Sequence, residues 1–159
     1  MPYRVAVRAR ARALALVGVL ATVAALAAGA RGATSRTTEL RLDGAVFRPE
    51  LALTSAQQQR GLMYRKRAPL DGMLFVFAWP SSGGFWMKNT LVPLRIVFFD
   101  TAGKRVRGLS MTPCTQDPCR IYSPGKQYRF ALELPATDRR PALRLGSPAD
   151  LRRLLASVR

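Results

Sequence analysis

Short apolar segments separated by tight-turn sequences run through most of this chain, and they limit its fold more than any other feature. Asp43-Gly44, Asp71-Gly72 and Pro124-Gly125 are typical turn dipeptides. The segments between them are too short for long helices and are rich in β-branched and aromatic residues. The sequence therefore predicts an α+β, mainly β fold. Its compact, barrel-like antiparallel sheet would protect strand edges by closing or nearly closing.

The expected strands differ in how they are buried. Residues 94–99 form a dense apolar run with β-branched and aromatic residues, which is typical of a strand buried on both faces. In residues 128–134 large apolar side chains alternate with Arg129, Ala131 and Glu133, which predicts a half-buried strand with Glu133 on its polar face. Gly108 interrupts the alternation of residues 105–111 and predicts a bulge there. The remaining expected strands are residues 39–42, 46–53, 73–77 and 85–90.

A short helix is expected in the N-terminal third of the chain. Thr54 or Ser55 is a good N-cap, and Gln57 or Gln58 follows three residues later, as a capping box requires. Gly61 marks the C-terminal end of this helix.

A second helix is expected at the C-terminus. Ser147 followed by Pro148 is a typical helix start. Apolar residues then recur at helical spacing: Leu151, Leu154, Leu155 and Val158. These side chains either pack on the sheet or, with the surrounding arginines, form a basic surface for anionic lipid or a partner protein.

The first thirty residues have the three parts of a secretory signal. Arginines precede an apolar run over residues 13–30, which ends in Ala28-Gly29-Ala30. The run is slightly short for a membrane span, which needs about 20 residues. We therefore expect a cleaved signal at 1–30, with an uncleaved inner-membrane anchor as the alternative. A flexible lead at 31–38 and one globular domain at 39–159 would follow, placing the protein in the periplasm or outside the cell.

Cys114 and Cys119 are the only cysteines, and export would place them in an oxidising compartment. Their loop contains two prolines, so a turn can bring the two Cα atoms within bridging range. We expect a structural disulfide. A redox pair usually has two residues between its cysteines rather than four. A metal site would need further ligands, and no metal or cofactor is expected.

The chain contains no histidine, which excludes Ser-His-Asp and Cys-His catalysis and histidine metal sites. Its formal net charge of +17 is typical of proteins that bind nucleic acid. However, part of that charge belongs to the expected signal, and no basic block is flanked by stacking aromatic residues. Nucleic acid is therefore not an expected partner, and no catalytic residue is assigned.

Four motifs follow one another along the domain. They are Arg60-Gly61-Leu62-Met63-Tyr64-Arg65, Gly72-Met73-Leu74-Phe75-Val76-Phe77, Phe85-Trp86-Met87-Lys88-Asn89-Thr90 and Leu132-Glu133-Leu134-Pro135. In order and spacing this set resembles the domain-of-unknown-function 192 family, also called uncharacterised protein family 0127. The resemblance covers about residues 46–146. It implies a compact β-rich domain, often exported or anchored in bacteria, with no established reaction.

The chain departs from the family pattern at two positions. Arg95 stands where the family usually has Asp, and Ser147 follows Gly146 where the family often has Gly-Asp. If those carboxylates bind or react in relatives, this chain has lost or replaced that function. The reversed charge at Arg95 favours a more anionic partner.

Two of the motifs carry the candidate ligand-binding residues, which are Arg60, Arg65, Trp86, Lys88, Asn89 and Thr90. Trp86 offers an aromatic face, Lys88 a positive charge and Asn89 both a donor and an acceptor. In an extended strand Trp86, Lys88 and Thr90 would share one face. Arg60 or Arg65 could clamp a carboxylate or phosphate.

A purely structural interpretation of the same residues stays open. Trp86 and the neighbouring methionines are typical core residues. Asn89-Thr90 would then shape a turn. Arg65 would pair with Asp71, and Arg60 with Glu50.

These observations favour an exported binding module for a small or polymeric, anionic or sugar-like ligand. Two alternatives remain. One is a hydrolase or lyase that uses Glu133 or Asp71 together with Lys88. The other is an accessory protein that associates with a membrane surface or a partner through its basic C-terminal helix.

Overall fold

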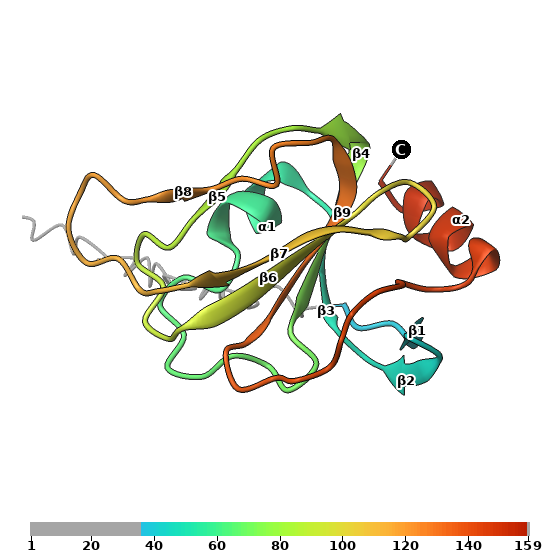
Figure 1. Cartoon of the computed structure of the whole chain (residues 1–159), viewed down its shortest axis with the longest axis horizontal. Coiled ribbons are helices and arrows are strands. Elements are labelled where there is room, and N and C mark those ends of the chain that lie inside the picture. Colours follow the sequence, from blue (N-terminus) through green and yellow to red (C-terminus); the bar gives the residue numbers. More distant parts are fainter. Residues whose placement is uncertain (1–35, 159) are drawn as a thin grey trace, which may run out of the picture. The chain divides into compact units, whose positions relative to one another are not determined.

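A computed structural model of the chain describes residues 36–158 (Figure 1). The expected signal and most of the expected lead lie outside the described residues. The last part of the lead pairs with a strand, because Thr37 forms an antiparallel bridge with Glu50. The carbonyl of Arg36 also accepts a hydrogen bond of 2.7 Å from the Leu51 amide.

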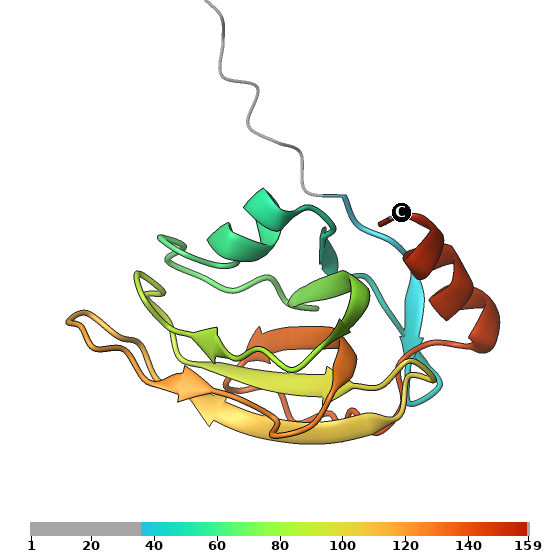
Figure 2. The same cartoon turned by 90° about the horizontal axis from the view of Figure 1, so that it is seen from above.

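A five-stranded sheet forms the centre of the domain (Figures 1 and 2). Its strands, in spatial order, are β3 (Glu50–Ala52), β4 (Met73–Ser81), β9 (Tyr128–Pro135), β6 (Leu94–Phe99) and β7 (Arg105–Met111). The β3–β4 pair is parallel, and the other three pairs are antiparallel.

Smaller elements surround this sheet. β1 (Leu40–Leu42) pairs with β2 (Ala45–Phe47), and β5 (Phe85–Trp86) pairs with β8 (Ile121–Tyr122). The two helices are α1 (Ser55–Arg60) and α2 (Pro148–Ala156). The described residues therefore form a mainly β domain with two short helices, as the sequence predicts.

The expected barrel is not confirmed, because the central sheet ends in two edge strands, β3 and β7. Tight turns connect only antiparallel neighbours, whereas the parallel β3–β4 pair needs a crossover, which α1 and the following loop provide. The edges are protected in other ways. β3 is short and bridges to Thr37, and β7 exposes Arg105 and Arg107.

The first hairpin follows its turn sequence closely. Asp43 and Gly44 have φ angles of 52° and 86°, which is the left-handed geometry of a two-residue hairpin turn. The expected strand over 46–53 is divided into β2 and β3 at Arg48-Pro49.

The half-buried strand expected at 128–134 is wrong, because β9 lies in the middle of the sheet and both its faces are covered. Leu132 and Leu134 belong to one apolar cluster, and Ala131 belongs to the other. The bulge expected at Gly108 is displaced. Phe98 pairs with Arg107 and Phe99 with Arg105, so the extra residue is Val106.

Both helices begin with a capping box, which the sequence predicts for α1; for α2 it predicts the N-cap Ser147 and the following proline. The Thr54 hydroxyl accepts from the Gln57 amide, and Gln57 Oε1 accepts from the Thr54 amide at 3.0 Å. Ser147 and Asp150 form the same arrangement at α2. Leu151 and Leu154 of α2 are buried in the core, so the packing interpretation of this helix is confirmed. No helix within 36–158 has the length and apolarity needed to cross a membrane.

Candidate functional site

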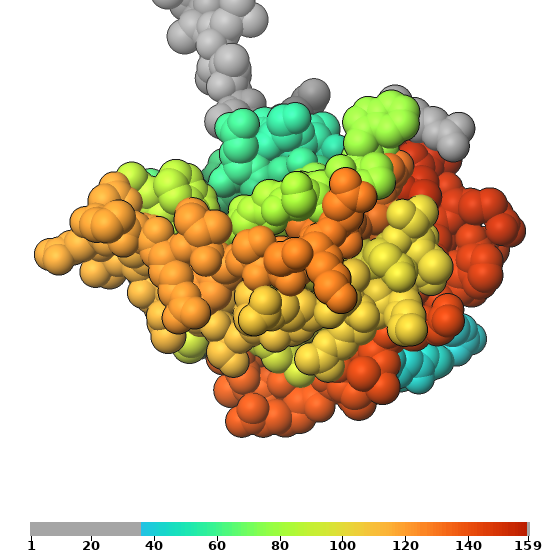
Figure 3. All heavy atoms as spheres, turned by 45° about the horizontal axis from the view of Figure 1, so that its top comes forward, coloured from blue at the N-terminus to red at the C-terminus, as the bar shows by residue number. Residues whose placement is uncertain are grey.

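A cleft of about 310 Å³ lies between α1, the end of β4, β5 and the start of β9. Figure 3 shows the atoms of α1 beside those of the β4–β5 segment on this side of the domain. Its lining residues are Ser55, Gln58, Gln59, Phe75, Phe77, Ser81, Gly83, Gly84, Phe85, Trp86 and Tyr128. None of them carries a formal charge at neutral pH.

Aromatic rings that hold one another in place build one wall of this aromatic cleft. Phe75 and Phe85 meet edge to face with ring centroids 4.9 Å apart, and Phe77 meets Tyr128 at 5.4 Å. The Tyr128 hydroxyl donates to the carbonyl of Gly83 at 3.0 Å, which ties β9 to the β4–β5 loop. Such interlocked rings form a rigid apolar surface.

Neutral polar groups complete the lining. Gln58 Nε2 donates to the Val76 carbonyl at 2.8 Å, so this side chain fastens α1 to β4. Gln59 and the hydroxyls of Ser55 and Ser81 add further amide and hydroxyl groups. The cleft thus combines an aromatic wall with uncharged donors and acceptors.

Trp86 is the predicted site residue that lines the aromatic cleft, and 46% of its surface is exposed. Lys88 Nζ lies 5.6 Å from the centroid of the Trp86 ring, within cation–π range. The same ammonium lies 2.5 Å from Asp117 Oδ2. The structure therefore brings Trp86 and Lys88 together at the edge of the cleft.

The loop that carries Asp117 is closed by a disulfide between Cys114 and Cys119, with Cα atoms 5.8 Å apart. Lys88 and Cys114 form a parallel bridge, and the Cys114 amide donates to the Met87 carbonyl. The disulfide loop is thus fastened to the chain immediately after β5, and it positions the partner of Lys88.

The shared face expected for Trp86, Lys88 and Thr90 does not form, because β5 ends at Trp86. The next residues make a turn in which the Thr90 amide donates to the Met87 carbonyl and Asn89 has a φ of 57°. The Asn89 carbonyl accepts from the Tyr64 amide at 2.7 Å, and Thr90 is buried. Asn89 therefore links two of the sequence motifs through its backbone.

The two arginines of the candidate set differ in their surroundings. Arg65 makes a bidentate contact of 2.9 and 2.8 Å with Glu50, which raises the pKa of Arg65. Arg60, the last residue of α1, is exposed. The pairing expected between Arg65 and Asp71 is wrong, because Arg65 binds Glu50 and Asp71 binds Arg140.

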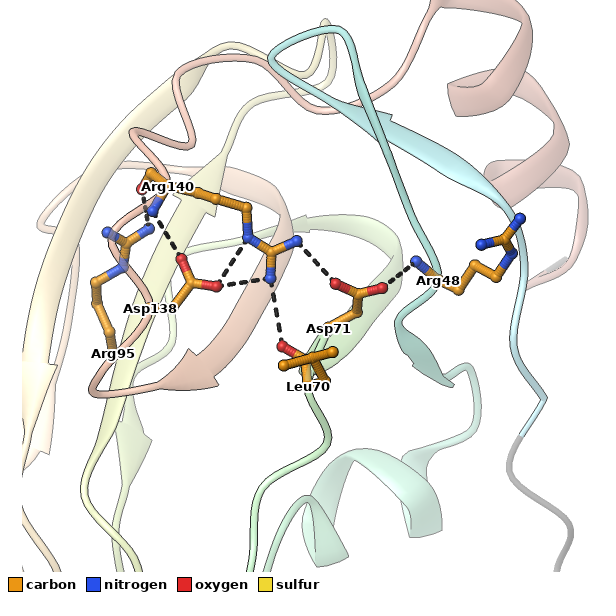
Figure 4. A network of polar contacts seen from close by, with 6 residues as sticks. All are labelled: Arg48, Leu70, Asp71, Arg95, Asp138 and Arg140. Atoms are coloured by element: carbon orange, nitrogen blue, oxygen red, sulfur yellow. Dashed lines mark hydrogen bonds and ion pairs between the residues drawn. The ribbon is translucent and has the colours of Figure 1, made fainter.

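Neither carboxylate proposed for catalysis is available, because Asp71 is held by hydrogen bonds and Glu133 is buried. Asp71 accepts from Arg140 Nη1 and from the Arg48 amide, each at 2.8 Å (Figure 4). Glu133 is only 5% exposed, and burial raises its pKa to about 8. Glu133 therefore does not lie on a solvent-facing polar face as expected. Its carboxyl group lies inside the domain close to Gly61, where an added Cβ would be 3.8 Å from Glu133 Oε2. No hydrogen bond within 36–158 joins either carboxylate to Lys88.

Sequence reasoning missed most of the cleft lining. The sequence identifies Gln58 only as a helix residue and Tyr128 only as a strand residue. One signal is present in the sequence: Ser55–Arg60 contains three glutamines and no large apolar side chain, and the structure buries none of these residues. A helix with no apolar side needs another reason for its position beside the sheet.

Comparisons with known proteins agree with this fold. The chain is 29% identical to a Sinorhizobium meliloti protein described as a candidate transcription regulator, with a TM-score of 0.60 over 70% of this chain and 93% of that one. It is 27% identical to a protein of unknown function from Novosphingobium aromaticivorans, with a TM-score of 0.52 over 74% and 76% of the two chains. No curated protein matches the chain significantly. The family DUF192, described as "Uncharacterized ACR", matches residues 38–140, and the chain therefore belongs to this family.

Proposed function

We propose that this protein is a binding domain whose aromatic cleft takes a sugar-like ligand. The observation that carries the proposal is the lining of the cleft, where the half-exposed ring of Trp86 stands beside uncharged amide and hydroxyl groups. Sugar rings have apolar C–H faces that stack on aromatic rings, and their hydroxyls bond to neutral donors and acceptors. A volume of about 310 Å³ suits one or two such rings.

Lys88 is proposed to select ligands that carry a carboxylate on the sugar. Its ammonium lies above Trp86 and is held by Asp117, whose side chain is 58% exposed. Because exposed ion pairs are weak, a ligand carboxylate can replace Asp117 at little cost. Arg65 is less suited to such a role, since Glu50 already neutralises it.

We also propose that the domain works outside the cytoplasm. The disulfide at Cys114 and Cys119 supports this location, since such bonds persist in oxidising compartments. Arginines followed by an apolar run at the N-terminus support the same route of export.

Two tryptophans allow a matched test of the aromatic cleft. Trp86 lines it, whereas Trp79 is 80% exposed, lies beneath Arg129 and is absent from the lining. Binding of neutral and uronic-acid oligosaccharides would be measured by calorimetry. Trp86→Ala should weaken binding by about tenfold or more, the scale of a lost aromatic contact, and Trp79→Ala should leave it unchanged. Equal losses in both variants, or no binding by the unaltered chain, would contradict the proposal.

Lys88→Met separates the charge from the ring. It should weaken binding of the acidic oligosaccharide and leave the neutral one unchanged. The same loss for both ligands would show that Lys88 does not select charge.

A further inference from the structure

A second, smaller pocket lies on the opposite edge of the central sheet from β3, and it shares no residue with the aromatic cleft. It has a volume of about 200 Å³. Its lining residues are Arg95, Val97, Arg105, Gly108, Leu109 and Ser110, all from β6 and β7. We propose that this arginine pocket binds a small tetrahedral oxyanion, either free phosphate or the phosphate group of a larger molecule.

Strand register places the two arginines over the same face. Arg95 pairs with Ser110, and Val97 pairs with Gly108, so these four residues share one side of the sheet. Arg105 of β7 pairs with Phe99, so it lies on this same face of the sheet. A Cβ at Gly108 would lie 2.8 Å from Arg105 Nη2, so the guanidinium lies across the space that Gly108 leaves open.

Backbone carbonyls hold both guanidinium groups without neutralising them. Arg95 Nη2 donates to the Arg140 carbonyl at 2.7 Å (Figure 4), and Arg105 Nη1 donates to the Pro141 carbonyl at 3.2 Å. The buried Nε of Arg95 has no partner within 36–158. Neutral carbonyl groups, rather than a direct ion pair, therefore orient the two arginines.

The local charge balance favours an anion. No acidic residue lines the arginine pocket. Asp138 is the carboxylate that attracts Arg95, but its oxygens already accept from the Arg140 amide and Nε. Burial lowers the pKa of Arg95, and the positive charges of Arg105, Arg140 and Arg139 lower it further. A bound dianion would relieve this repulsion.

Protection of an edge strand explains only part of this arrangement. Exposed charges on β7 discourage pairing with another sheet, which accounts for Arg105 and Arg107. Edge protection does not account for Arg95. This residue is partly buried on β6, an inner strand that lies between β7 and β9. Two guanidinium groups match the charge of phosphate, which is about −1.5 to −2 at neutral pH, and can donate to different oxygens of one tetrahedron.

Calorimetric titration of the full chain at constant ionic strength tests this proposal. Inorganic phosphate and glycerol 3-phosphate would be compared as ligands. Arg95→Met and Arg105→Met should each weaken binding about tenfold or more. Arg107→Met is the matched control, since Arg107 pairs with Phe98 and lies on the other face of β7. It should leave binding within about twofold of the unaltered chain.

The two ligands distinguish the sources of the oxyanion. Equal affinity indicates free phosphate, and tighter binding of the ester indicates a phosphate group on a larger molecule. Arg105→Met keeps the test decisive if Arg95→Met fails to fold, because Arg105 is exposed. Dissociation constants above about 10 mM for both ligands, or an equal loss in Arg107→Met, would overturn the proposal.

Discussion

Glu133 carries a carboxyl group in surroundings that disfavour its charge. It lies on the central strand β9, between Met73 of β4 and Ile96 of β6. Its Oε2 has no hydrogen-bond partner within the described residues, and a Cβ at Gly61 would lie within 4 Å of both this oxygen and the Phe75 ring. The raised pKa of about 8 therefore comes from burial. At neutral pH the folded protein holds Glu133 mostly in its neutral form.

This protonation makes stability depend on pH. Between pH 4.5, the ordinary pKa, and about 8, the folded chain keeps a proton on Glu133 that the unfolded chain has released. The free energy of unfolding should therefore fall as pH rises through this window, by up to about 1.4 kcal/mol per pH unit, and level off above it. Glu133→Gln should remove this slope. Urea unfolding at pH 5, 7 and 9 measures the effect.

An exposed carboxyl supplies the control for Glu133. Glu39 pairs with Arg48 at the surface, with 59% of its side chain exposed. Glu39→Gln should keep the pH slope of the unaltered chain. An unchanged slope in Glu133→Gln would show that Glu133 is ionised in the folded protein.

Sequence reasoning at the scale of residues succeeded where a rule is local. Thr54 and Gln57 form their capping box because the spacing alone brings the groups together. Cys114 and Cys119 form a disulfide across a short loop for a similar reason. Local rules do not predict the surroundings of Arg65 and Glu133, because these depend on strands far away in the sequence.

Local signals also located most secondary-structure elements, whereas their neighbours in space were not predictable. The strand β6 and the Asp43-Gly44 hairpin are where the sequence places them. The parallel β3–β4 pair was missed, because a crossover joins strands without a turn signal between them. Both faces of β9 are buried because apolar clusters pack on both sides of the sheet, whereas the alternating pattern of this strand predicts only one buried face.

Helix α2 provides a prediction at the scale of elements. Leu154 is 4% exposed and packs in the same cluster as Leu132 and Leu151. Leu154→Ala should lower the free energy of unfolding by about 2–5 kcal/mol, because it leaves a cavity. The exposed Arg152 is the control, and Arg152→Ala should change stability by less than about 0.5 kcal/mol. A Leu154→Ala variant of unchanged stability that loses binding to anionic vesicles would instead support a membrane role for this helix.

The sequence predicts the part of the site that lies in one motif, but not the part that distant segments form together. The motif around Trp86 and Lys88 could be found in the sequence, and the structure does bring these two side chains together. The cleft beside them joins α1, β4, β5 and β9, which come from four separate stretches of chain. Only the tertiary arrangement shows that Gln58 and Tyr128 face the same space.

At the scale of the whole described domain, Arg140 fastens distant segments together (Figure 4). It contacts Asp138 after β9 and Asp71 before β4, and it also donates to the Leu70 carbonyl. Asp71 in turn accepts from the Arg48 amide. A single guanidinium therefore links the segment after β9 to the turn before β4, and Asp71 extends this link to the segment before β3.

Loss of this guanidinium should destabilise the whole domain. Arg140→Met leaves Asp138, whose side chain is 8% exposed, and Asp71 without their cation, and should lower the free energy of unfolding by about 1–3 kcal/mol. Burial raises the pKa of Asp138, but hydrogen bonds and the charge of Arg140 outweigh it and lower that pKa below its usual 3.8. The difference between the two proteins should therefore be complete above about pH 4 and shrink as acid protonates Asp138. Arg139→Met, which changes an exposed neighbour, should be nearly neutral in urea unfolding. Equal effects of the two substitutions at neutral pH would show that Arg140 does not hold these turns together.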